Sequence, residues 1–385
     1  MTSLMLVFFV AGMVALVVGA ELLVRGAAHL AEVLGISPLV IGLTVVAYGT
    51  SAPELAVSVQ ASWLDQADLA VGNVVGSNIM NVLLILGVSA LIIPLTVARQ
   101  LLWLDVPLMI GLSILTLVFG LDGRIGRWDG VFFVSVLVGY TVFLIRKSRR
   151  EVAAERAAER AAERAANPDQ PLAAVIGSRL GQIVWDVVFV LAGLGLLVLG
   201  SRWLVDGAVA LATFLGVSEL LIGLTVVALG TSLPEVATTL AAAIRGQRDI
   251  AVGNVVGSCT FNIISVLGIS SLVSRDGILV SAQALQFDIP VMIGVAIACL
   301  PVFYTGGTVS RWEGGLFFGY YIAYTVYLIL HATHNGSLAP FEHAMLWFVI
   351  PLTAATLVIH SWYCFRRGRI DACRELPTAA RDANP

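Results

Sequence analysis

The stretch Gly42-Leu-Thr-Val-Val-Ala-Tyr-Gly-Thr-Ser-Ala-Pro-Glu54 places a carboxylate, hydroxyls and a proline in a segment that is otherwise apolar enough to lie in lipid. The pattern returns 181 residues later as Gly223-Leu-Thr-Val-Val-Ala-Leu-Gly-Thr-Ser-Leu-Pro-Glu235, with 11 of the 13 positions identical. A carboxylate at membrane depth is costly and marks a functional site by default. Two carboxylates at equivalent positions therefore predict a polar site inside a membrane.

A second polar motif follows each of these stretches. The sequence Ala70-Val-Gly-Asn-Val-Val-Gly-Ser77 returns unchanged as Ala251-Val-Gly-Asn-Val-Val-Gly-Ser258. Residues four apart share one face of a helix. This spacing pairs Thr50 with Glu54, Ser77 with Asn81, Thr231 with Glu235, and Ser258 with Asn262.

A proline directly precedes each glutamate. Pro53 and Pro234 cannot donate a backbone hydrogen bond and crowd the carbonyl four residues earlier, so each helix is expected to loosen just before its glutamate. Carboxylates, hydroxyls, amide oxygens and freed carbonyls form an all-oxygen ligand set, which suits hard cations such as Na+ and Ca2+. The alternative is a polar contact that only fastens helices together, and it would need neither glutamate.

The composition is that of an integral membrane protein. Hydrophobic residues make up 58% and charged residues 12% of the 385 residues, whereas a soluble domain has about 25% charged residues. The four cysteines have no C-x-x-C spacing, so neither a disulfide framework nor a zinc site is predicted. A span needs about 20 apolar residues. Eleven runs have about that length, namely residues 4–34, 38–63, 69–93, 101–120, 128–145, 180–215, 219–244, 250–273, 284–304, 312–330 and 344–363.

The first ten runs form two halves of five. Because five is odd, the second half enters the membrane from the opposite side, and the polar motifs meet near the midplane. We therefore predict an all-α integral membrane protein with two inverted five-helix repeats, ten core transmembrane helices and an eleventh, C-terminal one. The predicted units are the first repeat at 1–146, a cytoplasmic polar helical linker at 147–178, the second repeat at 179–331, the extra helix at 340–366 and a cytoplasmic tail at 367–385.

Basic residues near the span ends predict the orientation. The cluster at 146–150 places the linker in the cytoplasm, and Arg99 and the Arg245/Arg248 turn then fall on the same side. Asp105 and Asp288 begin their spans and are expected to be interfacial or capping residues. The GxxxG pairs at 72/76 and 253/257 are interpreted as close helix packing.

The paired G-x-T-x-x-A-x-G-T-S-x-P-E and G-N-x-x-G-S elements resemble the two alpha repeats of the cation/calcium exchanger superfamily, in particular the prokaryotic sodium/calcium exchangers. The resemblance covers about residues 4–330. It implies ten helices in two inverted halves, a central cluster of cation sites, and alternating access by movement of the first and sixth helices.

The resemblance also implies ligands, motif position by motif position. Glu54 and Glu235 would be shared by Ca2+ and Na+, and Thr50 and Thr231 would add oxygens to Ca2+. Asn81 and Asn262 are expected to supply amide oxygens from opposite sides of the site. Two outlying Na+ sites would be formed by Ala47, Ser51 and Ser77, and by Ala228, Ser232 and Ser258.

Three features depart from the family pattern. Asn262 stands where some relatives have Asp, so a third central carboxylate is absent and K+ co-transport is disfavoured. Cys259-Thr260-Phe261 replaces Asn78-Ile79-Met80 of the first copy, which puts the symmetry of the sites in doubt. The eleventh apolar run has no place in a ten-helix pattern.

These observations predict a secondary active antiporter, not an enzyme, that exchanges Ca2+ for Na+ as a multi-pass protein of the cell membrane. No resident cofactor and no nucleic-acid partner are expected. The expected partners are the lipid bilayer and the transported ions, and the chain is expected to function as a monomer. No ATP-binding motif of the Walker type is present. Two alternatives stay open: an H+/Ca2+ antiporter in which protons titrate the glutamates, and a channel or ion-gated sensor.

Overall fold

The structure, a computed structural model, describes residues 3–63, 68–166, 179–214, 228–304, 307–333, 336–357 and 359. In this part of the chain nine helices are long and apolar enough to cross a membrane, and a bent pair, Pro38–Thr50 with Ala52–Trp63, adds a tenth. These ten match ten of the eleven predicted spans. The remaining one, at 219–244, lies partly outside the described residues, and its second half contains the helix Leu233–Ile244.

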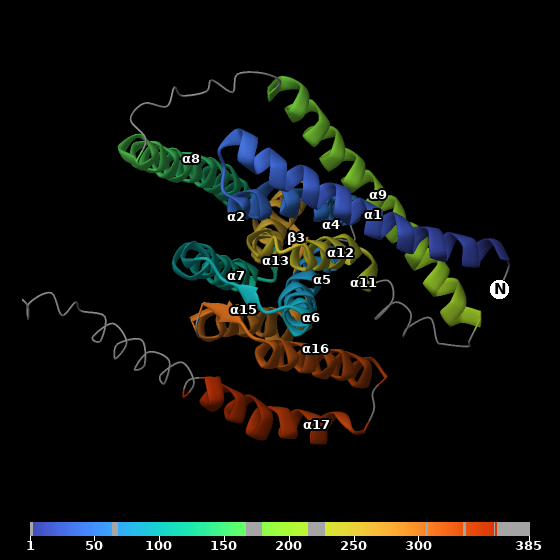
Figure 1. The fold of residues 1–385 in the computed structure, drawn as a ribbon. Coiled ribbons are helices and arrows are strands. Elements are labelled where there is room, and N and C mark those ends of the chain that lie inside the picture. Colours follow the sequence, from blue (N-terminus) through green and yellow to red (C-terminus); the bar gives the residue numbers. More distant parts are fainter. Residues whose placement is uncertain are drawn as a thin grey trace, which may run out of the picture.

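The first repeat has five spans, several of which consist of successive helical segments (Figure 1). Its first span is α1 (Ser3–Leu34), and its fifth is α8 (Arg127–Ala166), which continues without a break into the predicted linker. The second span comprises α2 (Pro38–Ile41), η1 (Gly42–Val46), α3 (Ala47–Thr50) and α4 (Ala52–Trp63). The third comprises α5 (Asp68–Met80), η2 (Asn81–Leu86) and α6 (Gly87–Ile92), and the fourth η3 (Leu101–Asp105) and α7 (Val106–Gly120).

The second repeat follows the same plan. It begins with α9 (Arg179–Phe214), and its other described elements are α11 (Ala228–Gly230), α12 (Leu233–Ile244), α13 (Arg248–Phe261), η5 (Asn262–Leu267), α14 (Gly268–Val273), η6 (Ala284–Asp288), α15 (Ile289–Tyr304) and α16 (Arg311–Ala332). The π-helical turns η2 and η5 begin at equivalent asparagines, and η3 and η6 also correspond. Such turns are frequent at functional sites, and these turns are present at equivalent positions in both repeats.

Two short strand pairs join loops of different repeats. β1 (Leu95–Thr96), after the third span, pairs with β4 (Thr308–Val309), which precedes the tenth. β2 (Arg124–Ile125), after the fourth span, pairs with β3 (Ile278–Leu279), after the eighth. The loops after the third and eighth spans are equivalent in the two repeats, yet they take part in different pairs. The pairing therefore agrees with the predicted inversion of the second repeat.

A seam of glycines joins the first span of each repeat. The helices α1 and α9 lie side by side and antiparallel (Figure 1). A Cβ atom at Gly19 would lie 2.9 Å from the carbonyl oxygen of Gly193, and one at Gly193 would lie 2.6 Å from the backbone nitrogen of Leu23. The seam recurs every seven residues, at Gly12, Gly19 and Gly26 of α1 and at Gly193, Gly200 and Gly207 of α9. Close backbone contact of this kind holds membrane helices together without polar groups.

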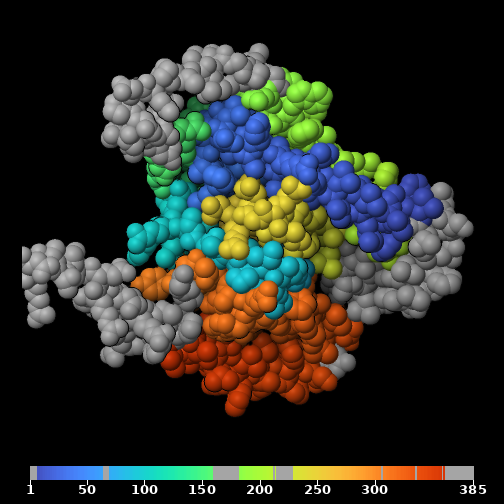
Figure 2. All heavy atoms as spheres, in the orientation of Figure 1, coloured from blue at the N-terminus to red at the C-terminus, as the bar shows by residue number. Residues whose placement is uncertain are grey.

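The C-terminal helices lie at the opposite end of the molecule from α1 and α9 (Figure 2). The predicted eleventh span corresponds to α17 (Leu338–Ala344), η7 (Met345–Val349) and the helical residues up to Leu357. It contacts α16 through the Tyr320 hydroxyl, which donates to Thr353 Oγ1 over 2.8 Å. Trp347 and Phe348 are 77% and 73% exposed, as expected for side chains that face lipid.

Cysteine labelling tests the orientation. In a variant whose Cys364 and Cys373 are replaced by Ser, Ser337→Cys should react with an impermeant thiol reagent in intact cells, because the positive-inside rule places the loop before α17 outside. The matched variant Ala157→Cys, on the exposed end of α8, should react only after permeabilisation. The reverse pattern would overturn the predicted topology.

Candidate cation site

The second span is broken beside the glutamate of its motif, Glu54. The backbone of Ser51 (φ −83°, ψ 7°) leaves the helical region, and the helices on either side of it are bent by 47°. Ser232 has nearly the same conformation (φ −92°, ψ 8°) ahead of α12. Pro53 and Pro234 lie in the first turn of the helices that follow, where no N–H donor is needed. The predicted loosening before each glutamate is confirmed.

Each broken span reaches across to the glutamate of the other repeat. The Ser51 hydroxyl donates to Glu235 Oε1 over 2.9 Å, and the Ser232 hydroxyl donates to Glu54 Oε1 over 3.0 Å. All four residues are at most 1% exposed, and the two carboxylates act on each other electrostatically. The repeat thus brings two acidic side chains into one buried place.

Among the described residues, several buried oxygens of the predicted ligands have no hydrogen-bond partner. They are Oε2 of Glu54, Oε2 of Glu235, the hydroxyl of Ser258 and the amide oxygens of Asn81 and Asn262. Buried polar atoms are nearly always bonded, so each exception calls for an explanation. Carboxylate, amide and hydroxyl oxygens are the groups that bind Na+ and Ca2+, and these five oxygens have this chemistry. The other buried, unpartnered side-chain atoms of the described residues are the amide nitrogen of Asn81 and the hydroxyls of Ser62, Ser89, Thr238 and Ser270, none of which was predicted as a ligand atom.

The other predicted ligands lie on the same broken spans or beside them. Thr50 and Ala47 are fully buried in α3, and the hydroxyl oxygen of Ser77 lies 3.3 Å from that of Ser232. Thr231 interacts with the Glu54 carboxylate. Of Ala228 the structure describes only the helical backbone.

Two asparagines of the repeated motif were not predicted as site residues. Asn254 accepts a hydrogen bond of 3.2 Å from the Thr50 hydroxyl and donates one of 2.9 Å to Thr239. Its counterpart Asn73 donates to the Ser58 hydroxyl over 2.9 Å in the same way. Their identity in both copies of the octapeptide was the signal that could have found them. They hold the motif helices in register and so orient the predicted ligands.

The replaced segment around Cys259 has a direct effect on the site. Asn78 and Cys259 hold equivalent positions and contact each other, since Asn78 Nδ2 donates to the Cys259 carbonyl over 3.1 Å. Asn262 Nδ2 donates to Asn78 Oδ1 over 3.1 Å. The amide nitrogen of Asn262 is therefore occupied, and its oxygen is left free for an ion.

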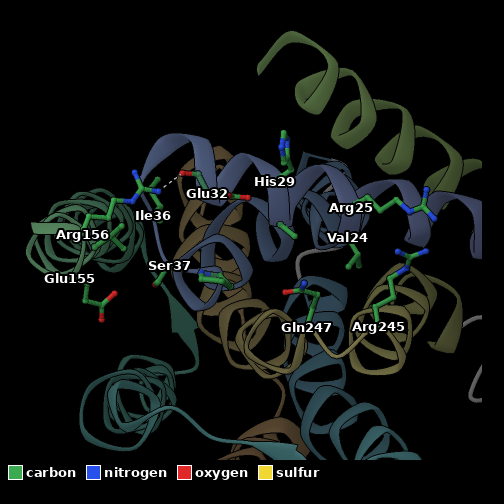
Figure 3. A pocket seen from close by; sticks show the side chains of 13 residues that line it. Val24, Arg25, His29, Glu32, Ile36, Ser37, Glu155, Arg156, Arg245 and Gln247 are labelled. Carbon is green, nitrogen blue, oxygen red and sulfur yellow. Dashed lines mark hydrogen bonds between the residues drawn. The ribbon is translucent and has the colours of Figure 1, made fainter. Parts of the chain in front are cut away.

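A cavity of about 630 Å³ lies apart from this site, on the predicted cytoplasmic side (Figure 3). It is lined by the end of α1, the start of α2, the extension of α8 and the turn between α12 and α13. Its cationic side chains are already engaged: Arg156 donates to the carbonyl of Glu32 over 2.8 Å, and Arg25 and Arg245 both pair with Glu21. None of the predicted ligands lines the cavity, so the carboxylate pair is closed off from it.

The sequence profile of the sodium/calcium exchanger protein family matches residues 4–146 and 185–330. The chain belongs to this family. The chain is 34% identical over 341 residues to the sodium/calcium exchanger MaX1 of Methanosarcina acetivorans, and the match covers 82% of this chain and 96% of MaX1. It is 38% identical over 297 residues to the inner membrane protein YrbG of Escherichia coli, and this match covers 76% of this chain and 86% of YrbG.

A solved structure of the sodium-calcium exchanger NCX_Mj superimposes with a TM-score of 0.69 at 30% identity, covering 84% of this chain and 98% of that one. The predicted membership of the superfamily and the predicted fold class are thereby confirmed. The exchanger is a multi-pass membrane transporter, and its relatives support an antiporter of cations that include Ca2+.

Proposed function

We propose that this exchanger carries Na+ and Ca2+ in opposite directions across the cell membrane, and that both ions use the site between Glu54 and Glu235. The observation that carries the proposal is the pair of buried carboxylates that the broken spans hold through Ser51 and Ser232, together with the unpartnered oxygens of the predicted ligands. Two carboxylates give the site a formal charge that one Ca2+ balances. Several Na+ ions can take the same oxygens, so the two ions compete.

The likeness of the chain to sodium/calcium exchangers favours sodium over protons as the counter-ion. Here the hydroxyl of Ser258 and the amide oxygens of Asn81 and Asn262 are also unpartnered. Neutral oxygens of this kind complete the coordination of Na+ and Ca2+. H+/Ca2+ exchange and a channel remain the alternatives that flux measurements must exclude.

Alternating access would involve α1 and α9 moving over the motif helices. Both helices pack against α12, and α1 also packs against η1. Their glycine seam joins them to each other through backbone contacts. The cavity beside the cytoplasmic end of α1 gives that helix room to shift. We infer that the pair moves as one unit and exposes the site to each side in turn.

Calcium binding to the purified protein tests the shared site. Na+ should displace Ca2+ competitively, and choline should not. Ser51→Ala and Ser232→Ala should each weaken Ca2+ binding by about tenfold, because a hydrogen bond to a charged group contributes about 1.5 kcal/mol. Ser135→Ala, which removes a hydroxyl bonded only within its own helix turn, should bind as the wild type does. Calcium binding that Na+ leaves unchanged would contradict the proposal.

A further inference from the structure

Asp105 is buried within the protein and does not cap its helix, which corrects the prediction of a capping residue. Its exposed fraction is 0%. It stands at the start of α7, but its side chain makes no capping hydrogen bond. Instead Asp105 Oδ1 accepts a hydrogen bond of 2.7 Å from the Tyr140 hydroxyl, and Oδ2 accepts one of 3.2 Å from Gln100. Asp105 is thus a further buried carboxylate of a membrane-spanning segment, in addition to the two glutamates of the cation site, and such groups are functional candidates.

Polar side chains connect Asp105 to the predicted cytoplasmic surface. Lys147 Nζ donates to the amide oxygen of Gln100 over 3.0 Å, so one amide side chain separates the lysine from the aspartate. Lys147 is 31% exposed and also pairs with Glu151 over 3.7 Å, on the part of α8 that leaves the membrane. Asp105 is therefore one side chain away from a partly exposed lysine on the predicted cytoplasmic side.

A second set of contacts leads from Asp105 toward the cation site. Tyr140 is followed by Thr141, whose hydroxyl is bonded to that of Tyr48. Tyr48 lies between two predicted ligands, Ala47 and Thr50. Its ring stacks on Phe261 with the ring centroids 4.3 Å apart, directly before Asn262. The side chain of Tyr48 therefore braces the turn that carries the ligands of the first repeat.

The equivalent aspartate of the second repeat lacks this arrangement. Asp288 is only half-buried, and its hydrogen bond from Tyr324 is longer, at 3.4 Å. The position of Tyr48 is occupied by Leu229, which has no hydroxyl. Among the described residues, the polar connection to the ligand-bearing turn thus exists in the first repeat only, on the side predicted to be cytoplasmic, and Asp288 is a natural control.

We propose that Asp105 is a proton-binding site, filled from the cytoplasm, whose occupancy is transmitted through Tyr140, Thr141 and Tyr48 to the cation site. The charged and titratable groups that act on Asp105 come from α8: Tyr140, and Lys147 through Gln100. The packed helices α7 and α15 contain no Asp, Glu, Lys, Arg or His, and α13 has Arg248 and Asp249 only at its first turn.

The sign of the effect follows from the hydrogen bond to Tyr140. A bond to an ionised carboxylate is about twice as strong as a bond between neutral groups. Proton uptake by Asp105 weakens the contact between the start of α7 and α8, and with it the hold of Thr141 on Tyr48. The ligand-bearing turn becomes less well positioned, so exchange slows as the cytoplasmic side is acidified.

Exchange measured in oriented vesicles tests the transmission, which rests on the proposed exchange function. The wild type should slow several-fold as the pH on the cytoplasmic side falls, and Asp105→Asn should run at one slow rate throughout. Tyr48→Phe, which keeps the ring stack but loses the hydroxyl, should also lose the response. Asp288→Asn should respond as the wild type does. Transmission is disproved if Asp105→Asn keeps the wild-type profile or if Asp288→Asn loses it equally.

Proton binding itself is measured without transport. The infrared difference spectrum of the purified protein between neutral and acidic pH should contain a carboxylic-acid carbonyl band that disappears in Asp105→Asn and persists in Asp288→Asn. A spectrum that is the same in the wild type and in Asp105→Asn would overturn the proton site, whatever ions the protein exchanges. A band together with a wild type that exchanges no ions would instead overturn the proposed exchange function and leave the proton site standing.

Discussion

Glu54→Gln and Glu235→Gln are each expected to abolish Ca2+ transport. Glutamine keeps the size of the side chain and one carbonyl oxygen but removes a negative charge from a buried site, where attraction to a cation is strongest. One carboxylate then faces a divalent ion, and leaving a buried charge uncompensated costs about 3 kcal/mol or more. Uptake of Ca2+ into vesicles should fall by at least about a hundredfold, since each 1.4 kcal/mol is a factor of ten.

The matched control is Glu151→Gln, which removes a carboxylate that is 53% exposed on the extension of α8. It should transport as the wild type does, because an exposed ion pair contributes little. The melting temperature of each variant separates loss of ion binding from loss of folding. A folded Glu54→Gln or Glu235→Gln protein with the wild-type rate would remove these residues from the site.

Gly193→Leu is expected to separate α1 from α9 and to destabilise the protein severely. A Cβ atom at this position would approach the backbone nitrogen of Leu23 to 2.6 Å and the carbonyl oxygen of Gly19 to 2.8 Å. Backbone atoms in a helix cannot move aside as a flexible side chain can, so the whole helix must shift. Overpacking of this kind costs about 1–3 kcal/mol and occasionally more, and transport should be lost with it.

Gly195→Leu is the control on the same helix. Gly195 is exposed, and among the described residues no atom lies within 4 Å of a Cβ built there. A leucine at this position faces outward and should leave both the melting temperature and transport unchanged. Equal tolerance of the two substitutions would mean that the glycine seam does not hold α1 to α9.

The repeat made the fold predictable. Matching motifs 181 residues apart, together with an odd number of spans in each half, led to the inverted arrangement that the strand pairs reflect. The π-helical turns were not predicted, because one extra residue in a helical turn cannot be recognised in a sequence whose residues are nearly all apolar. The glycine seam was visible as a seven-residue spacing, yet only its contacts identify α9 as the partner of α1.

The candidate site was predictable in its residues but not in its connections. The sequence pairs Thr50 with Glu54 on one helix face, whereas the structure joins Ser51 to Glu235 on the other repeat. Such a bond depends on how two broken spans cross. The capping role predicted for Asp105 was wrong for a similar reason: its side chain bonds to Tyr140 of another helix and not to the backbone of its own.

The central claim is that Na+ and Ca2+ exchange through one site, and counter-flow in reconstituted vesicles tests it most directly. Vesicles loaded with Na+ and diluted into Na+-free medium with Ca2+ should accumulate Ca2+. The uptake should stop when the Na+ gradient is removed and should be absent in Glu54→Gln. Uptake driven by a proton gradient alone would support H+/Ca2+ exchange instead, and uptake without any counter-gradient would indicate a channel; either result would contradict the account.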